Sequence, residues 1–166
     1  MREVALSREN LHIIEMLRRI ERFSGFSDRD LRSLVEVARL REYAPGETVI
    51  REGEFDCWVY FLLTGALEIV KGEQPVGRLQ RLGDLFGEMG IIDGSPRSAT
   101  IRAVKNSLIL GVDGSVVDRQ VKKRDLAFCY TIYRLFAEVL AARLRATTEE
   151  NIRLTNLLQH RSDEAA

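Results

Sequence analysis

The polar and apolar positions of this chain follow a helical period at both ends and a strand-like pattern in between. Near the start, Leu11, Ile14 and Leu17 recur at three-residue steps with charged residues among them, which indicates an amphipathic helix. Ser27 then supplies an N-cap for a second helix, and acidic residues follow it in the first turn. The pattern therefore predicts N-terminal helices over residues 1–39.

Short apolar segments separated by turn signals fill residues 40–114. The dipeptide Thr64-Gly65 divides residues 60–70 into what reads as a hairpin-like pair of strands. Farther along, apolar residues occupy every second position of residues 99–103, as in a half-buried strand. Short strands at this spacing predict a closed or rolled antiparallel sheet, and so a mainly β fold with flanking helices.

Residues 115–160 are predicted to be helical. No Gly or Pro occurs from residue 124 to residue 160, which favours one long helix, and a shorter helix is expected before it at residues 116–123. Two stripes of apolar residues run along the predicted long helix. The first, which we expect to pack on the roll, consists of Cys129, Ile132, Phe136 and Val139. The second, called the heptad seam below, takes alternating three- and four-residue steps through Leu126, Tyr130, Tyr133, Ala137, Leu140, Leu144, Thr147, Asn151, Leu154 and Leu158.

The heptad seam predicts a homodimer. A single helix on a monomer has no use for so long an apolar seam, whereas two parallel helices cover each other's seams over residues 126–158. The polar Asn151 would then set the register of the pair. The alternative is that the seam folds back on the chain's own N-terminal helices.

Composition and charge limit the classes of function. With 166 residues and 45% apolar content, residues 1–166 can bury the core of one domain. Lys plus Arg equals Asp plus Glu, 25 of each, so no basic field favours nucleic acid or a membrane surface. The charged N-terminus fits neither a signal peptide nor a membrane span. Cys57 and Cys129 lie far apart and read as reduced core thiols, so we expect a cytoplasmic protein.

Histidines are scarce, and this bears on catalysis. Only His12 and His160 are present, one near each end of the chain. A jelly-roll enzyme needs a cluster of His and Glu around a metal, and a nucleophilic triad needs a His base. We therefore expect no catalytic residues, no metal and no cofactor, and a jelly-roll enzyme is the alternative that the histidine count opposes.

Residues 86–100 carry the strongest candidate chemistry and read FGEMGIIDGSPRSAT. They place Glu88 and Arg97 nine residues apart, joined by an apolar segment with glycines and a Gly-Ser-Pro turn. Arg97 can pair with a phosphate through two parallel, charge-assisted hydrogen bonds. Glu88 only accepts hydrogen bonds when ionised and so suits a sugar hydroxyl. Backbone N–H groups near the glycines can add donors to an anion.

The order FGE, two aliphatic residues and then PRSAT resembles the phosphate-binding cassette of the cyclic nucleotide-binding domain family. Upstream, PGETVIREGE at residues 45–54 resembles the opening turn and strand of the same family's fold, so the resemblance implies an antiparallel β-roll of the double-stranded jelly-roll type. The resemblance implies that Glu88 holds the ribose 2′-hydroxyl and Arg97 the cyclic phosphate. It also implies that Ser98 adds its hydroxyl and N–H, with the N–H groups of Gly87 and Ala99 close by. The ligand-binding residues expected in the cassette are Phe86, Gly87, Glu88, Met89, Arg97, Ser98 and Ala99.

Residues 142–151 resemble the dimer helix of this family's bacterial transcription activators. The resemblance implies that Thr147 and Thr148 contact the base, one of them from the partner subunit. It places Arg143 near the phosphate and Glu88. The alternative interpretation of the two threonines is that they are ordinary polar residues of a helix interface.

Together these features predict a regulatory module without catalytic activity. It is expected to bind cyclic AMP rather than cyclic GMP, and to signal to an unidentified protein effector through its C-terminal helix and dimer contacts. No room for a helix-turn-helix domain follows the long helix, so we expect no direct DNA binding by this chain and no membrane contact. Whether the chain is a complete protein or a sensor fragment stays open. A second hypothesis is a dimeric scaffold that keeps the fold but binds no nucleotide.

Overall fold

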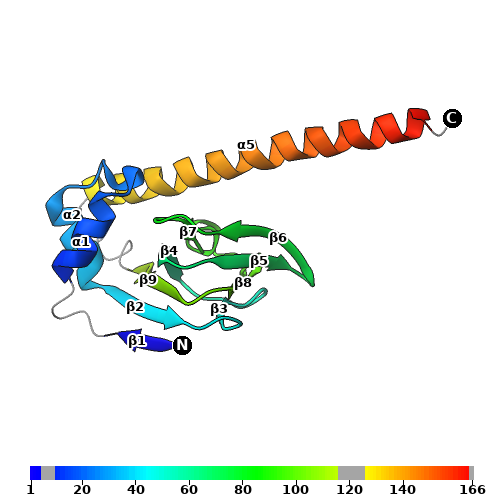
Figure 1. Ribbon diagram of the computed structural model, residues 1–166. Coiled ribbons are helices and arrows are strands. Elements are labelled where there is room, and N and C mark those ends of the chain that lie inside the picture. The colour runs from blue at the N-terminus through cyan, green and yellow to red at the C-terminus, as the bar shows by residue number, and fades with distance from the viewer. Residues whose placement is uncertain (5–9, 116–125, 165–166) are drawn as a thin grey trace. The chain divides into compact units, whose positions relative to one another are not determined.

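The computed structural model of the chain describes residues 1–4, 10–115 and 126–164 (Figure 1). The chain divides into two compact units, Met1–Thr131 and Ile132–Ala166. The first unit contains every strand of the described residues, together with the N-terminal helices. In the second unit the described residues belong to one long helix.

The N-terminal part of the first unit is helical apart from one short strand. The strand β1 (Arg2–Val4), which the helical prediction for residues 1–39 misses, precedes α1 (Asn10–Arg18), the 3-10 helix η1 (Glu21–Phe23) and α2 (Asp28–Glu36). The predicted N-cap of α2 is confirmed. The Ser27 hydroxyl accepts from the Asp30 N–H at 3.2 Å, and the Asp30 carboxylate accepts from the Ser27 N–H at 2.9 Å. The helix α2 ends at Glu36 and β2 (Ala38–Tyr43) begins two residues later, so the helical prediction for residues 1–39 extends too far.

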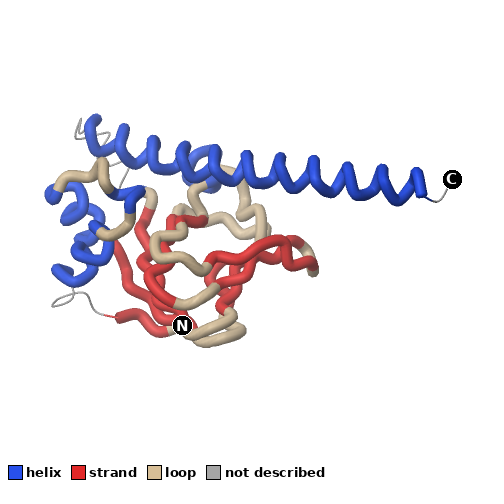
Figure 2. Tube along the Cα trace, turned by 45° about the horizontal axis from the view of Figure 1, so that its top comes forward, coloured by secondary structure: helices blue, strands red, loops and turns tan. Residues whose placement is uncertain are grey.

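The described strands form two antiparallel sheets. After β2 they are β3 (Thr48–Ile50), β4 (Trp58–Thr64), β5 (Leu67–Lys71), β6 (Gln74–Leu79), β7 (Leu85–Phe86), β8 (Thr100–Ala103) and β9 (Ser107–Asp113). One sheet has the order β1-β2-β9-β4-β7, and the other has the order β3-β8-β5-β6. The predicted fold class, an antiparallel β-roll with flanking helices, is confirmed (Figure 2).

The strands β4 and β5 follow each other in sequence but do not pair. β4 pairs with β7 and β9, whereas β5 pairs with β6 and β8. The hairpin predicted at Thr64-Gly65 is therefore wrong, because this turn moves the chain from one sheet to the other. Gly65 has a φ of 105°, and a Cβ there would lie 2.3 Å from the Ser107 hydroxyl oxygen. That hydroxyl accepts from the Ala66 N–H at 3.2 Å and holds the start of β5.

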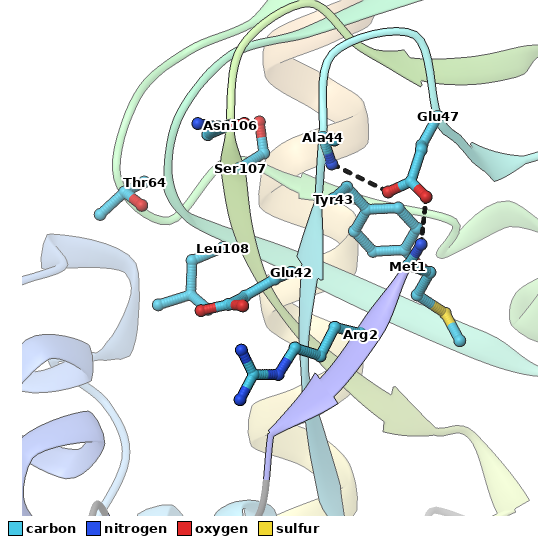
Figure 3. A pocket seen from close by; sticks show the side chains of 10 residues that line it. All are labelled: Met1, Arg2, Glu42, Tyr43, Ala44, Glu47, Thr64, Asn106, Ser107 and Leu108. Carbon is cyan, nitrogen blue, oxygen red and sulfur yellow. Dashed lines mark hydrogen bonds and ion pairs between the residues drawn. The ribbon is translucent and has the colours of Figure 1, made fainter.

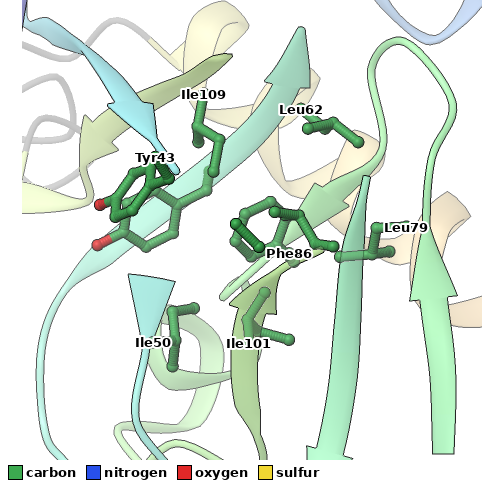
Figure 4. Close-up of a cluster of buried hydrophobic side chains, with 10 residues drawn as sticks. Tyr43, Ile50, Leu62, Leu79, Phe86, Ile101 and Ile109 are labelled. Atoms are coloured by element: carbon green, nitrogen blue, oxygen red, sulfur yellow. The ribbon is translucent and has the colours of Figure 1, made fainter. Parts of the chain in front are cut away.

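The core of the roll lies between the two sheets (Figure 4). Tyr60 and Phe86 stack there with ring centroids 5.3 Å apart. Burying such side chains contributes roughly 1.5–3 kcal/mol each. The members from the first sheet are Tyr43, Tyr60, Leu62, Phe86 and Ile109, and those from the second are Ile50, Leu67, Leu79, Ile101 and Ala103.

The outer face of the first sheet packs against the segment around the 3-10 helix η1. Phe61 alternates with the core residues Tyr60 and Leu62 on β4 and so points to the opposite face. Its ring lies 5.1 Å from the ring of Phe23 in η1, which is 5.0 Å from that of Phe26. The helices α1 and α2 lie at one end of the strands of this unit (Figures 1 and 2).

The C-terminal helix α5 (Leu126–Glu164) runs without a break, as predicted from residue 124 onward. The shorter helix predicted at residues 116–123 lies outside the described residues. Within the second unit, the seam residues Leu144 and Leu158 are 68% and 65% exposed. That the first stripe packs on the roll stays a prediction. No helix among the described residues has the apolar length needed to cross a bilayer.

Candidate functional site

The cassette begins with a turn that requires glycine. β7 leads into Gly87, whose φ is 86°. A Cβ at Gly87 would lie 2.8 Å from Nη1 of Arg97 and 2.9 Å from the Trp58 carbonyl oxygen. The short helix α3 (Met89–Asp93) follows, and the left-handed Gly94 ends it. The chain then returns to Arg97 beside Gly87, so this turn brings the two halves of the cassette together.

Arg97 is almost completely buried, with 5% of its surface exposed. Its Nε donates to Asp56 Oδ2 at 2.9 Å, and its Nη2 donates to Asp56 Oδ1 and to the Trp58 carbonyl. Nη1 donates to the carbonyl of Gly87. The two parallel hydrogen bonds expected for a phosphate are thus made with Asp56. Among the described residues, one N–H of Nη1 has no partner and can serve an anion.

Asp56 is the principal residue that the sequence analysis missed. Burial by itself raises the pKa of Asp56, but hydrogen bonds from Arg97 and from the Trp58 N–H, with the charge of Arg97, hold it below the usual value. Asp56 is therefore an anion at neutral pH. One signal was available, because a buried guanidinium needs a carboxylate partner. The residues 52–56 before Trp58 contain three acids, and spacing alone does not select one of them.

Glu88 is the other charged residue that the cassette buries, with 1% of its surface exposed. Glutamate is almost never buried to this extent unless its carboxylate is paired. Its backbone carbonyl accepts from the Ile91 and Ile92 N–H groups at 3.0 and 3.1 Å, so α3 starts directly after it. The carboxylate is therefore carried on a fixed backbone.

The remaining cassette residues differ in what they offer a ligand. Met89 and Ser98 are exposed, and the Ser98 hydroxyl lies 3.9 Å from the Met89 sulfur. Ala99 is half-buried and directly precedes β8. The ring of Phe86 is in the core against Tyr60, so Phe86 presents only its backbone to a ligand. The structure thus brings the predicted cassette residues together, with the ring of Phe86 facing away.

The segment before Asp56 runs alongside the phosphate half of the cassette. The Gly53 N–H donates to the Arg97 carbonyl at 2.9 Å, and the Arg97 N–H donates to the Glu54 carbonyl at 2.8 Å. One step farther, the Glu52 N–H donates to the Thr100 hydroxyl at 3.0 Å. Backbone pairing and the ion pair with Asp56 therefore fix Arg97 from the same segment.

The three residues predicted on the long helix lie in the second unit. Thr147 and Thr148 are exposed and Arg143 is half-buried. The Thr148 hydroxyl donates to the Leu144 carbonyl of its own helix at 2.8 Å, which leaves it as an acceptor for other groups. The approach of these residues to the cassette involves both units and stays a prediction.

A hollow of about 620 Å³ lies elsewhere on the first unit (Figure 3). In it, Glu47 accepts from the Ala44 N–H at 2.8 Å and contacts the Met1 amine. No cassette residue lines it, so its position does not bear on the cassette. Within the described ranges, no group of three or more His, Cys, Asp or Glu could hold a metal ion. The residues that line the hollow are Met1, Arg2, Glu42, Tyr43, Ala44, Glu47, Thr64, Asn106, Ser107 and Leu108.

Comparisons with known sequences agree with the motif. Residues 40–124, slightly more than half of the chain, match the family model of the cyclic nucleotide-binding domain. The cAMP-dependent protein kinase regulatory subunit of Mycosarcoma maydis is 36% identical over 85 residues, which cover 49% of this chain and 16% of that protein. The chain spans less than half of the length of curated relatives such as these.

Comparisons with solved structures agree with the fold. A cyclic nucleotide-binding domain from Methylobacillus flagellatus KT has a TM-score of 0.76 at 20% identity, covering 90% of this chain and 86% of that one. The catabolite activator protein of Thermus thermophilus has a TM-score of 0.64 at 24% identity, covering 81% of this chain and 62% of that one. These likenesses show the fold, and the family-model match confirms the resemblance read from residues 86–100. The chain belongs to the cyclic nucleotide-binding domain family.

Proposed function

We propose that this chain is a regulatory module that binds a cyclic nucleotide in its cassette, with cyclic AMP preferred over cyclic GMP. The observation that carries the proposal is the buried Arg97, held by Asp56 and Gly87 with one N–H left for an anion. A domain that needed only to fold would gain little from burying this guanidinium, because desolvating a charge is costly.

The proposal assigns a separate task to each cassette residue. Arg97 supplies its charge and one donor to the cyclic phosphate, and the N–H groups of Ser98 and Ala99 add neutral donors. Glu88 accepts from the ribose 2′-hydroxyl. On the long helix, Thr147 and Thr148 contact the base and Arg143 lies near the phosphate. The choice of cyclic AMP rests on the resemblance of residues 142–151 to the dimer helix of the bacterial activators, because the relatives include both a cAMP-dependent kinase subunit and cGMP-dependent kinases.

Signalling then follows from a shift between conformations. A ligand that contacts both the cassette and the long helix favours the arrangement in which both contacts are made. It shifts the equilibrium only by its difference in affinity for the two states. Micromolar binding corresponds to about −8 kcal/mol, which is ample for a shift of a few kcal/mol. We propose that the homodimer formed through residues 126–158 passes this change to a protein effector.

Calorimetric titration with cyclic AMP and cyclic GMP tests the site. Arg97→Ala should weaken binding by about 2–4 kcal/mol, because the phosphate loses its charged partner. Arg81→Ala is a matched control, since Arg81 is also on the first unit but is exposed. The affinity of this variant for the nucleotide should equal that of the wild type. Equal affinities of Arg97→Ala and wild type would show that the site assignment is wrong. An absence of binding by the wild type would favour the scaffold hypothesis.

A further inference from the structure

Lys71, at the end of β5, contacts the cassette from the second sheet. Its Nζ donates to the Ser98 carbonyl at 2.7 Å and to Glu52 Oε1 at 2.6 Å. The other carboxylate oxygen of Glu52 accepts from the Gly72 N–H at 2.8 Å. Lys71 is 58% exposed, so a long and flexible side chain is held in place at the surface by Glu52. Three segments distant in sequence therefore meet at the Ser98 carbonyl.

The carbonyl of the preceding peptide group also accepts a hydrogen bond from another segment. The Arg97 carbonyl accepts from the Gly53 N–H at 2.9 Å, and the next carbonyl, that of Ser98, accepts from Lys71. In a trans peptide the N–H points away from the C=O of the same unit. The N–H groups of these two units belong to Ser98 and Ala99. Neither N–H donates to a protein group among the described residues.

We propose that Lys71, fixed by Glu52, is a positioning residue of the phosphate subsite that acts through the Ser98–Ala99 peptide group. This inference rests on the proposed function, because it assigns a supporting residue to the same site. A hydrogen bond to a carbonyl polarises the whole peptide group and makes its N–H a stronger donor. A cationic donor does so more than a neutral one. The Ala99 N–H is thereby aligned and strengthened for an anionic oxygen.

Glu52 holds the ammonium against the carbonyl. The hydrogen bond from Lys71 and that from the Gly72 N–H keep the pKa of Glu52 below its ordinary value, so its carboxylate is ionised at neutral pH. Glu52→Gln keeps an oxygen for the Gly72 N–H but removes the ionic partner of Lys71. It should therefore weaken nucleotide binding less than removal of Lys71 itself.

The first test compares affinities for cyclic AMP by calorimetry. Lys71→Met should weaken binding about three- to tenfold, and Lys71→Arg should recover most of that loss, because it restores a cationic donor. Lys105→Met is the matched control, since it removes the same charge from another exposed position of the roll and should change affinity less than about twofold. Circular dichroism and a melting curve establish that each variant is folded. If Lys71→Met binds cyclic AMP as tightly as the wild type does, the inference is wrong and the proposed function is unaffected.

The second test asks whether the loss passes through a phosphate oxygen. The two diastereomers of the cyclic AMP phosphorothioate each replace one exocyclic oxygen with sulfur, which is a weaker acceptor. One diastereomer places sulfur at the Ala99 N–H. For that ligand the loss of affinity caused by Lys71→Met should fall to less than about twofold, because the ligand already lacks the oxygen through which Lys71 acts, and the comparison has the form of a double-mutant cycle. Equal losses for cyclic AMP and both diastereomers would overturn the inference, because a general structural defect would affect all three ligands alike.

Amide NMR separates this inference from the proposed function. In protein without nucleotide, Lys71→Met should move the Ala99 amide proton upfield, and Lys105→Met should leave it in place. If the chemical shift of the Ala99 amide proton does not change, Lys71 does not polarise this peptide group and the inference is wrong. Failure of the wild type to bind any cyclic nucleotide would overturn the proposed function and the phosphate role of Lys71 together. Wild-type binding with an unmoved amide would overturn the inference alone.

Discussion

Arg97 and Asp56 are best considered as one ion pair between a buried side chain and a half-buried one, because 3% of the Arg97 side chain and 32% of the Asp56 side chain are exposed. Removing one partner of such a pair leaves a charge without compensation in a poorly solvated place. Exposure of Asp56 to water reduces the loss. We expect Asp56→Asn to lower the free energy of unfolding by about 1–2 kcal/mol at pH 7.

The contribution of Asp56 to stability should depend on pH, and the direction of its pKa shift gives the sign of that dependence. The folded pKa of Asp56 lies below the unfolded value, so its contribution is complete above the unfolded pKa of about 3.9 and is lost as the pH falls through the folded pKa. Urea unfolding of wild type and Asp56→Asn from pH 7 to pH 3 measures the difference. The two stabilities should converge in the acid part of this range. A gap that stays constant to pH 3 would show that the Asp56 charge is not responsible.

The same residues show what spacing can and cannot predict. Glu88 and Arg97 lie within one fifteen-residue segment, so their order in the sequence was enough to place them in one site. Asp56 lies 41 residues before Arg97, and Lys71 lies 27 residues before Ser98. These partners meet only because the second sheet and the segment before β4 fold against the cassette. A pattern that is read locally does not contain that information.

At the scale of elements, the turn between β4 and β5 decides how the two sheets connect. A Gly-containing turn between two apolar segments fits a hairpin and a change of sheet equally well, so the hairpin prediction had no local signal against it. The distinguishing fact is the approach of Asn106 and Ser107, because a Cβ at Gly65 would lie 2.3 Å from the Ser107 hydroxyl and 2.6 Å from the Asn106 carbonyl. This contact between distant segments decides the outcome.

Gly65→Ala should therefore destabilise the roll by about 2–4 kcal/mol, through a strained φ and a clash with backbone atoms. Gly72→Ala provides the matched control. Its φ is also positive, at 59°, but nothing lies within 4 Å of the added Cβ, so about 1 kcal/mol is expected. Equilibrium unfolding in urea compares the two. Equal losses would mean that backbone strain alone, and not the approach of residues 106–107, makes glycine necessary at the sheet change.

At the scale of the whole molecule, the sequence predicted the β-roll and the long helix but not how the helix is used. Alternation and turn spacing constrain strands that pair within one domain, and together with the family resemblance of residues 45–54 and 86–100 they predicted the confirmed fold class. A heptad seam indicates only that some apolar surface covers it. The same leucines would suit a second copy of α5 or the chain's own N-terminal helices. The choice between these partners therefore has to be measured.

The dimer proposal leads to a test on the seam itself. If two copies of α5 pair through the seam, Leu154→Glu places two carboxylates in their interface, where desolvation and repulsion oppose association. The variant should be monomeric in sedimentation equilibrium at concentrations where the wild type is dimeric, and the melting temperature of the roll should stay unchanged. Ile152→Glu is the control, because Ile152 is also exposed on α5 but lies off the seam, and it should remain dimeric. A monomeric wild type, or a Leu154→Glu variant that stays dimeric, would contradict pairing through the seam.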